Sequence, residues 1–245
     1  MTWNGKLINA SADAKTVKGE KRGYLTAIMY LAPNVVATRK TLCPHASPSC
    51  IAACLYTAGR GAFHSVQRAR IRKSKWFEAN QASFMQALVL DVSRFQKHAH
   101  KRDLIPCVRL NGTSDILFER IALPLCSNGD GSPIKIGHFS NIMAMFPGLQ
   151  FYDYTKCPIR LRRGLPVNYD LTFSQSEENE YAVKQALNDG FRVATVFKSK
   201  PETWLGQTVI DGDVSDLRFL DPSPCIVGLS AKGKARGDVS GFVKG

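Results

Sequence analysis

The sequence contains no apolar run long enough to cross a membrane, and no signal peptide opens the chain. These absences point away from a membrane-spanning or secreted protein. Hydrophobic residues make up 44% of the chain and charged residues 22%, which is an ordinary globular composition. A chain of 245 residues can bury a sizeable core without disulfides. We therefore expect a globular protein that makes no use of a membrane.

Acidic residues are scarce. The chain has 20 Asp and Glu against 33 Lys and Arg, which gives a formal net charge of +13. This surplus favours an anionic partner, and nucleic acid is the most common one. We expect a nucleic acid or a nucleotide, although bulk charge does not distinguish specific from nonspecific binding.

The seven cysteines do not divide evenly into pairs, and the chain lacks the two CxxC-like pairs typical of structural zinc sites. An odd, partly clustered set favours a reducing cytoplasm. Three of the seven, Cys43, Cys50 and Cys54, lie within twelve residues. Pro44 and Pro48 exclude a regular helix between the first two, so Cys43 belongs to a loop.

The run around Cys50 and Cys54 is compatible with a helix, and a spacing of four places both sulfurs on one helix face. A loop thiol beside two helix thiols makes a three-thiolate site, which is the number that an iron–sulfur cluster with one open iron needs. His45 would instead complete a Cys3His zinc site. The third interpretation is that the cysteines are simply buried beside the apolar residues 51–53.

The longest predicted helical region is 62–98. Its apolar residues recur on one helix face: Phe77, Phe84, Leu88, Val92 and Phe95. The first part of the region is strongly basic and adjoins the cysteines. We interpret it as a phosphate-binding patch, the alternative being a solvated helix face. The predicted patch consists of Arg60, Arg68, Arg70, Arg72, Lys73 and Lys75.

A strand–helix alternation runs through the rest of the chain and predicts an α/β fold. The predicted strands are residues 24–31, 106–110, 149–154, 169–173, 192–197, 208–210 and 225–229. Helices are predicted at 136–146 and at 177–189, the second with a serine N-cap. We expect a partial (β/α) barrel of about six parallel strands, with the cysteine loop after the first. Residues 1–23 form a polar lead-in, mobile or lying at an edge, and 24–245 form one domain.

Small polar or charged residues follow four of the predicted strands, at 111–115, 154–156, 174–178 and 211–213. In parallel sheets and barrels, ligands bind at the carboxyl ends of the strands. The pattern therefore predicts a ligand site at the same edge as the cysteines.

These residues resemble a known family. The strings CPHASPSCIAACLYTAGRG, RLNGTSDILFE, FYDYTK, NYDLTFSQSEEN and IDGDVSDLRFLDP, in this order, are similar to the gene-product-88 family of tailed-phage proteins. The resemblance covers residues 24–242. It implies a protein that works in the cytoplasm of the host cell, and it names a lineage more than an activity.

A looser similarity is to three-cysteine phage proteins akin to radical S-adenosylmethionine enzymes, carried by residues 47–54, 112–115 and 155–158. It implies a four-iron, four-sulfur cluster on Cys43, Cys50 and Cys54, with S-adenosylmethionine on its open iron. The usual cysteine spacing is three and then two residues, whereas this chain has six and then three. The residues expected at the cofactor are Asn111, Gly112, Thr113, Ser114, Asp115, Ser174, Ser176 and Glu177, with Asp115 as the catalytic carboxylate.

Two other functions fit the same residues. One is a non-enzymatic, metal-stabilised basic protein that binds host DNA or a host protein. The other is a barrel transglycosylase with zinc on the cysteines and Asp115 or Asp211 as the nucleophile.

Overall fold

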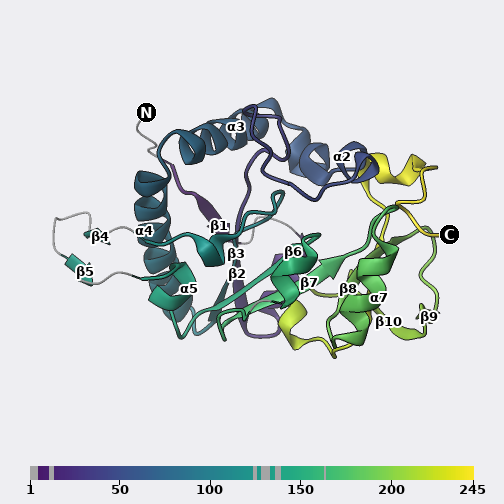
Figure 1. The fold of residues 1–245 in the computed structure, drawn as a ribbon. Coiled ribbons are helices and arrows are strands. Elements are labelled where there is room, and N and C mark those ends of the chain that lie inside the picture. The colour runs from purple at the N-terminus through teal and green to yellow at the C-terminus, as the bar shows by residue number, and fades with distance from the viewer. Residues whose placement is uncertain (1–4, 11–13, 124–125, 128–132, 136–138, 163) are drawn as a thin grey trace.

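The computed structural model describes residues 5–10, 14–123, 126–127, 133–135, 139–162 and 164–245. A nine-stranded sheet forms its centre, in the order β1-β2-β3-β6-β7-β8-β11-β10-β9 (Figure 1). The strands are β1 Ile8–Ala10, β2 Tyr24–Met29, β3 Ile105–Arg109, β6 Gln150–Thr155, β7 Tyr169–Ser174, β8 Val193–Phe197, β9 Thr203–Trp204, β10 Gln207–Asp211 and β11 Ile226–Ser230; β4 Cys126–Ser127 and β5 Pro133–Lys135 form a separate pair.

The described residues also form helices. They are α1 Ala14–Glu20, α2 Pro48–Ala52, α3 His64–Ala79, α4 Gln81–His100, α5 Ile142–Met145, α6 Pro158–Arg162 and α7 Glu180–Asn188, with 3-10 turns η1 Leu55–Thr57, η2 Gly59–Ala62, η3 Phe118–Arg120, η4 Arg218–Leu220 and η5 Gly233–Gly237. Among the described residues, no helix is long and apolar enough to span a membrane.

The sheet is open, so the expected barrel is not observed. Every pairing from β2 to β10 is parallel, and only the two outer strands β1 and β9 are antiparallel to their neighbours. The outer strands are three and two residues long. Short antiparallel edge strands end the hydrogen-bonding ladder instead of closing it. The expected parallel α/β sheet is confirmed, with more strands than predicted.

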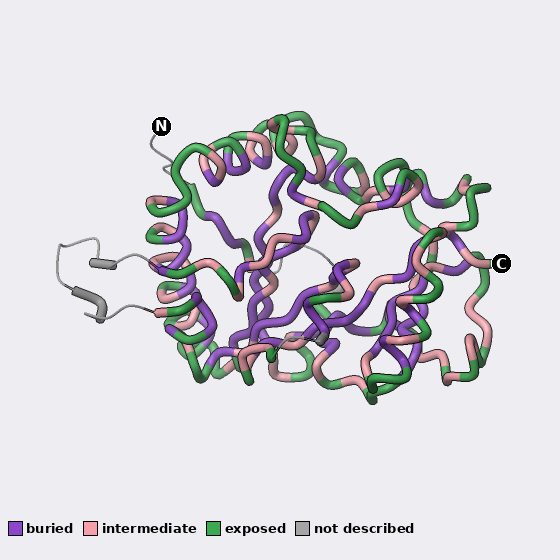
Figure 2. Tube along the Cα trace, viewed as in Figure 1, coloured by how far each residue is buried: buried purple, intermediate pink, exposed green. Residues whose placement is uncertain are grey.

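One face of the sheet packs against helices. Phe151, Leu171 and Phe173 on this face belong to the main core with residues of α4, α5 and α7. The five apolar residues predicted to share a helix face are all buried there, with exposed fractions of 7% or less. Figure 2 shows this buried side of α4 turned toward the strands.

The opposite face is covered by the connection between β10 and β11. Leu217 and Phe219 of this connection pack on Cys107 and Tyr152. The strand order reverses here, because β11 lies between β8 and β10 in the sheet. A right-handed crossover that runs in the reverse direction must cross the other face. The reversal therefore explains why residues 212–225 lie on the face of the sheet that is opposite to α4, α5 and α7.

The predicted long helix is two helices. Asn80 separates α3 from α4 with φ −152° and ψ 80°, and its side chain accepts a 3.0 Å hydrogen bond from the Ser83 amide. An Asn that caps the following helix in this way interrupts the helical backbone. The helical region 62–98 is thus interrupted at Asn80. The apolar spacing from which one helix was predicted continues across this position.

Three other predicted elements differ. Helix α7 begins at Glu180 rather than 177, because Asn179 binds backbone groups of the preceding turn. Helix α5 is restricted to four residues, and 136–138 lie outside the described residues. The polar lead-in supplies the edge strand β1, whose Ile8 is buried, and a helix that was not predicted.

Candidate three-cysteine site

All four polar segments predicted at strand ends follow parallel strands: β3, β6, β7 and β10. They therefore lie at one edge of the sheet, as predicted. The loop from 30 to 47 leaves β2 at the same edge and brings the cysteines there.

Cys50 lies in α2, but Cys54 lies beyond it. Helix α2 ends at Ala52, and Cys54 has non-helical backbone angles, φ −58° and ψ 134°. The chain then turns through η1, which buries Tyr56. The prediction that both thiols share one helix face is therefore wrong, since the helix ends two residues before Cys54.

The three cysteines nevertheless lie in one region of the structure. Burial raises the pKa of Cys43 to about 12, and the charges that Cys54 and Cys50 would carry raise it further. Burial also raises the pKa of Cys54, where a Cys50 thiolate acts in the same direction and the cations Lys156 and Arg70 oppose it. All three cysteines are free and half-buried.

Cys43 sits against the end of β3. Its Sγ accepts a hydrogen bond from the Asn34 amide at 3.4 Å and lies 3.7 Å from the carbonyl oxygen of Thr113, to which the thiol donates. The Asp115 amide donates to the Leu42 carbonyl at 2.8 Å. The loop after β3 thus contacts the cysteine loop directly.

Glu177, after β7, holds the other side of the cysteine segment. Its carboxylate accepts hydrogen bonds from the Ser47 hydroxyl at 2.8 Å and the Ser49 amide at 3.0 Å. The same Ser47 oxygen accepts from the Cys50 amide at 3.2 Å. Burial alone would raise the pKa of Glu177, but these hydrogen bonds lower it overall. Glu177, predicted at a cofactor, binds the cysteine-bearing helix of its own chain.

The C-terminal tail packs on the same segment. Ala53, between Cys50 and Cys54, forms a small core with Ala235 and Val243. Figure 1 shows the yellow tail beside α2. The site therefore combines segments from both ends of the chain, a proximity that the sequence pattern did not indicate.

Sulfur donors that gather at a strand edge fit a soft metal or an iron–sulfur cluster in their chemistry. Their arrangement is not yet that of a metal site, since among the described residues no three Cys, His, Asp or Glu side chains are grouped as the ligands of one metal ion. His45, the alternative fourth ligand, is exposed. Binding a metal would require the thiols to draw closer together.

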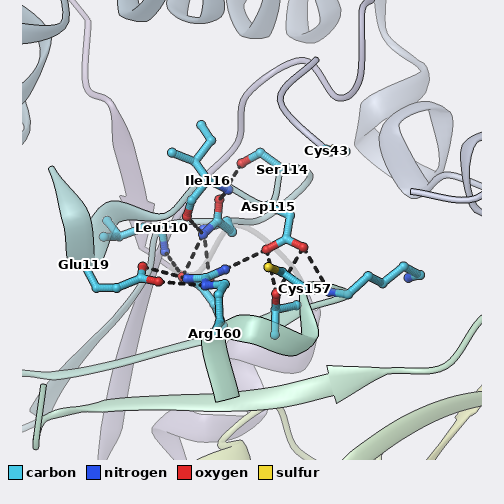
Figure 3. Close-up of polar contacts among 12 residues, drawn as sticks. Cys43, Leu110, Ser114, Asp115, Ile116, Glu119, Cys157 and Arg160 are labelled. Atoms are coloured by element: carbon cyan, nitrogen blue, oxygen red, sulfur yellow. Dashed lines mark hydrogen bonds and ion pairs between the residues drawn. The ribbon is translucent and has the colours of Figure 1, made fainter. Parts of the chain in front are cut away.

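Asp115 lies in a buried network on the helix-covered face (Figure 3). Its two carboxylate oxygens accept from the Thr155 hydroxyl at 2.9 and 3.1 Å, the Lys156 amide at 2.9 Å and the Arg160 guanidinium at 2.6 Å. Arg160, whose side chain is fully buried, also forms a two-bond ion pair with Glu119 at 2.9 Å. All these partners are groups of the protein. The Asp115 carboxylate therefore has a structural role, in which it links the loops after β3 and β6.

Asn111 and Asp153 extend this network. The Asp153 carboxylate accepts from the Asn111 amide at 2.9 Å and the Tyr169 hydroxyl at 3.0 Å. Asn111 in turn accepts from the Ser114 hydroxyl and the Ile116 amide. Asp153 is not among the residues predicted from the sequence, because it looks like an ordinary strand residue until its full burial is known.

Two more residues of the predicted cofactor set bind protein groups. The Thr113 hydroxyl donates to the Leu31 carbonyl at 2.5 Å. Gly112 has no room for a Cβ, which would lie 2.6 Å from the Tyr30 ring. The space beside Gly112 is thus occupied by Tyr30.

Ser174 and Ser176 remain at the edge. The carbonyl of Ser174 and the amide of Ser176 are both bound by the Asn179 side chain, which fixes the turn that leads to Glu177. Asp211, the other candidate nucleophile, forms an ion pair with Lys200 at 2.5 Å. It lies on β10, next to the edge strand β9.

The predicted basic patch is divided between two sides of α3. Arg60, Arg68, Arg72 and Lys75 are exposed. Arg70 is buried; its guanidinium lies 4.7 Å from the Tyr30 ring centre and donates to the Tyr56 carbonyl at 2.9 Å.

Lys73 is also buried. It donates to the Leu7 carbonyl at 3.2 Å, and burial lowers its pKa to about 8. The patch as predicted therefore does not form one surface, because Arg70 and Lys73 lie on the side of α3 that faces the core.

The protein is thus an α/β protein with a mostly parallel sheet and with a three-cysteine segment at the carboxyl ends of the strands. The family model described as Gene product 88 matches residues 3–244. The chain belongs to this phage family, as the sequence motifs indicated. No curated protein and no solved structure matches the chain.

Proposed function

We propose that the protein is an iron–sulfur protein of radical S-adenosylmethionine type, in which Cys43, Cys50 and Cys54 hold the cluster. The observation that carries this proposal is that three free, half-buried cysteines lie on one segment, which contacts the loops after β3 and β7. Three thiolates leave one iron of a four-iron cluster open. When bound, such a cluster supplies an electron and an open coordination position for the cofactor.

The residues around the thiols have defined tasks in this proposal. Glu177 and the loop after β3 orient the cysteine segment. Asp115 positions the loops after β3 and β6. The hydroxyl of Ser174, which is half-buried, is left to bind S-adenosylmethionine, whereas Ser176 is buried. The substrate is a nucleic acid or a nucleotide, in keeping with the net charge of +13, and the reducing cytoplasm of the host keeps the thiols available.

Anaerobic reconstitution with iron and sulfide tests the proposal. We expect brown protein with about four irons and four sulfides per chain, the content of one cubane cluster. Each of Cys43→Ala, Cys50→Ala and Cys54→Ala should abolish the visible absorption. Cys225→Ala is the matched control and should leave the absorption unchanged. Cys225 precedes the amino end of β11, whereas the cysteine segment lies at the carboxyl ends of the strands.

Two results would overturn the proposal. Stoichiometric zinc with no visible absorption would replace the cluster by a zinc site that includes His45. Calorimetry that shows no S-adenosylmethionine binding to fully loaded protein would remove the radical-enzyme assignment and leave the cluster.

The second candidate is a non-enzymatic basic protein that binds host DNA or a host protein. It is favoured by the absence, among the described residues, of three side chains grouped as metal ligands, and by the engagement of Asp115 and Glu177 within the protein. Retained binding of nucleic acid by a protein that takes up no iron would support it. No observation favours the transglycosylase.

A further inference from the structure

Two basic turns far apart in the sequence meet beside the cysteine segment. The turn η2 carries Arg60, and the turn η5 carries Lys234 and Arg236. A Cβ on Gly233 would lie 3.2 Å from the Cβ of Ala58, the residue that precedes η2. The tail is held there by Ala235 and Val243 and by the pairing of Lys244 with Phe197 of β8.

The three cations at this junction are available to a ligand. Arg60, Lys234 and Arg236 are exposed. Within the part of the chain that the structure describes, none of their side chains has a hydrogen bond or an ion pair. The nearest acid in the tail, Asp238, accepts from its own neighbours, the Ser240 hydroxyl and the Val243 amide, instead of from Arg236.

An aromatic side chain accompanies these cations. Phe63 follows η2 directly and is 63% exposed, although its backbone is fixed as the N-terminal boundary of α3. Arg68 is exposed one turn and a half further along the same helix. An exposed aromatic ring among unpaired cations is the combination that binds single-stranded nucleic acid, since cations contact phosphates and rings stack on bases.

We infer that Arg60, Phe63, Lys234 and Arg236 form a binding surface for single-stranded nucleic acid at the rim of the three-cysteine site. This inference rests on the proposed function for the role of the strand as substrate, but the binding itself does not require a cluster. It replaces the predicted patch, two of whose six residues are buried, by a surface to which the C-terminal tail contributes. A strand bound here would pass close to Cys54, because Ala58 and Ala53 both contact the tail.

Fluorescence anisotropy with a labelled 15-nucleotide single strand tests the inference on the full chain, both as purified and after reconstitution. In the double variant Lys234→Ser/Arg236→Ser, the loss of two phosphate contacts should flatten the log–log salt dependence by about 1.4, since each contact on a single strand contributes about 0.7. Phe63→Ala should weaken binding roughly 5- to 100-fold, the range seen when a stacking ring is removed. Circular dichroism should be unchanged, because all three side chains are exposed.

The matched control is Lys97→Ser/Lys101→Ser, which removes two exposed cations at the opposite end, where α4 leads into β3. This variant should bind as the wild type does. Equal losses in the two double variants would show that only net charge matters and would overturn the inference. So would binding to vesicles of anionic lipid in the absence of oligonucleotide binding. Failure to bind the strand by a protein that loads a cluster normally would refute this surface alone, whereas binding without cluster loading would refute only the iron–sulfur proposal.

Discussion

The hydroxyl of Ser47 donates a 2.8 Å hydrogen bond to Oε2 of Glu177, which lies 130 positions later in the chain. This bond joins the loop that follows β2 to the turn that follows β7. Through the Ser47 oxygen, which accepts from the Cys50 amide, it fixes the start of the helix that carries Cys50. The position of the cysteines is thus determined from outside the cysteine motif.

Replacing Glu177 should loosen the cysteine segment. Glu177→Ala removes two hydrogen bonds to a charged group, and we expect a loss of about 1–2 kcal/mol in the free energy of unfolding, below the full value because the site is partly exposed. Alkylation of Cys50 by iodoacetamide should become faster, and reconstituted protein should hold less iron. Glu178→Ala, one residue further and exposed, is the control and should change neither quantity. Unchanged alkylation in Glu177→Ala would mean that the segment is held by the tail alone.

The stability of the protein should depend on pH through Asp153. Burial raises the pKa of this carboxyl from 3.8 to about 6, against the opposing effects of Arg109, the Asn111 amide and Arg160. The folded state then binds more protons than the unfolded state between about pH 4 and 6, so stability falls as the pH rises through this window and levels off above it. A shift of about 2 units corresponds to at most about 3 kcal/mol.

Asp153→Asn removes this titration. Urea unfolding at pH 4 to 7 should show that the difference between wild type and Asp153→Asn changes by up to about 3 kcal/mol across the window, in the direction that disfavours the wild type at high pH. The exposed Asp189→Asn should leave the pH profile as it is. A constant difference between wild type and Asp153→Asn would show that Asp153 is ionised throughout.

The two sides of α3 should respond differently to the loss of a cation. Arg70 packs on Tyr30 and Tyr56 and binds the Tyr56 carbonyl. Arg70→Ser leaves that buried oxygen without its donor and opens a cavity, so we expect a loss of roughly 2–4 kcal/mol by urea unfolding. Arg68→Ser, on the exposed side, should lie within about 0.5 kcal/mol of the wild type. Equal losses would contradict the assignment of these two arginines to different environments.

The sequence by itself determined the family, the α/β class and the place of each of the seven parallel strands to within one or two residues. These features depend on local patterns: apolar runs of strand length, turn residues at the strand ends and motifs in fixed order. The buried face of α3 and α4 followed from apolar spacing for the same reason. The gathering of four polar segments at one edge followed from parallel strands alone.

Only the tertiary structure decided how those segments are used. Asp115, Glu177 and Arg70 are polar residues in suggestive places, but their partners lie 14 to 130 residues away in the chain. Whether such a side chain faces a ligand or a buried partner depends on which segments pack together. The spacing of apolar residues along the chain does not indicate which segments these are. The open sheet results from two short antiparallel edge strands: β1, which pairs with β2 across α1, and β9, which forms a hairpin with β10. The same packing placed the C-terminal tail beside the cysteines, because Ala53 is buried against Ala235 and Val243 rather than against its own neighbours in the sequence.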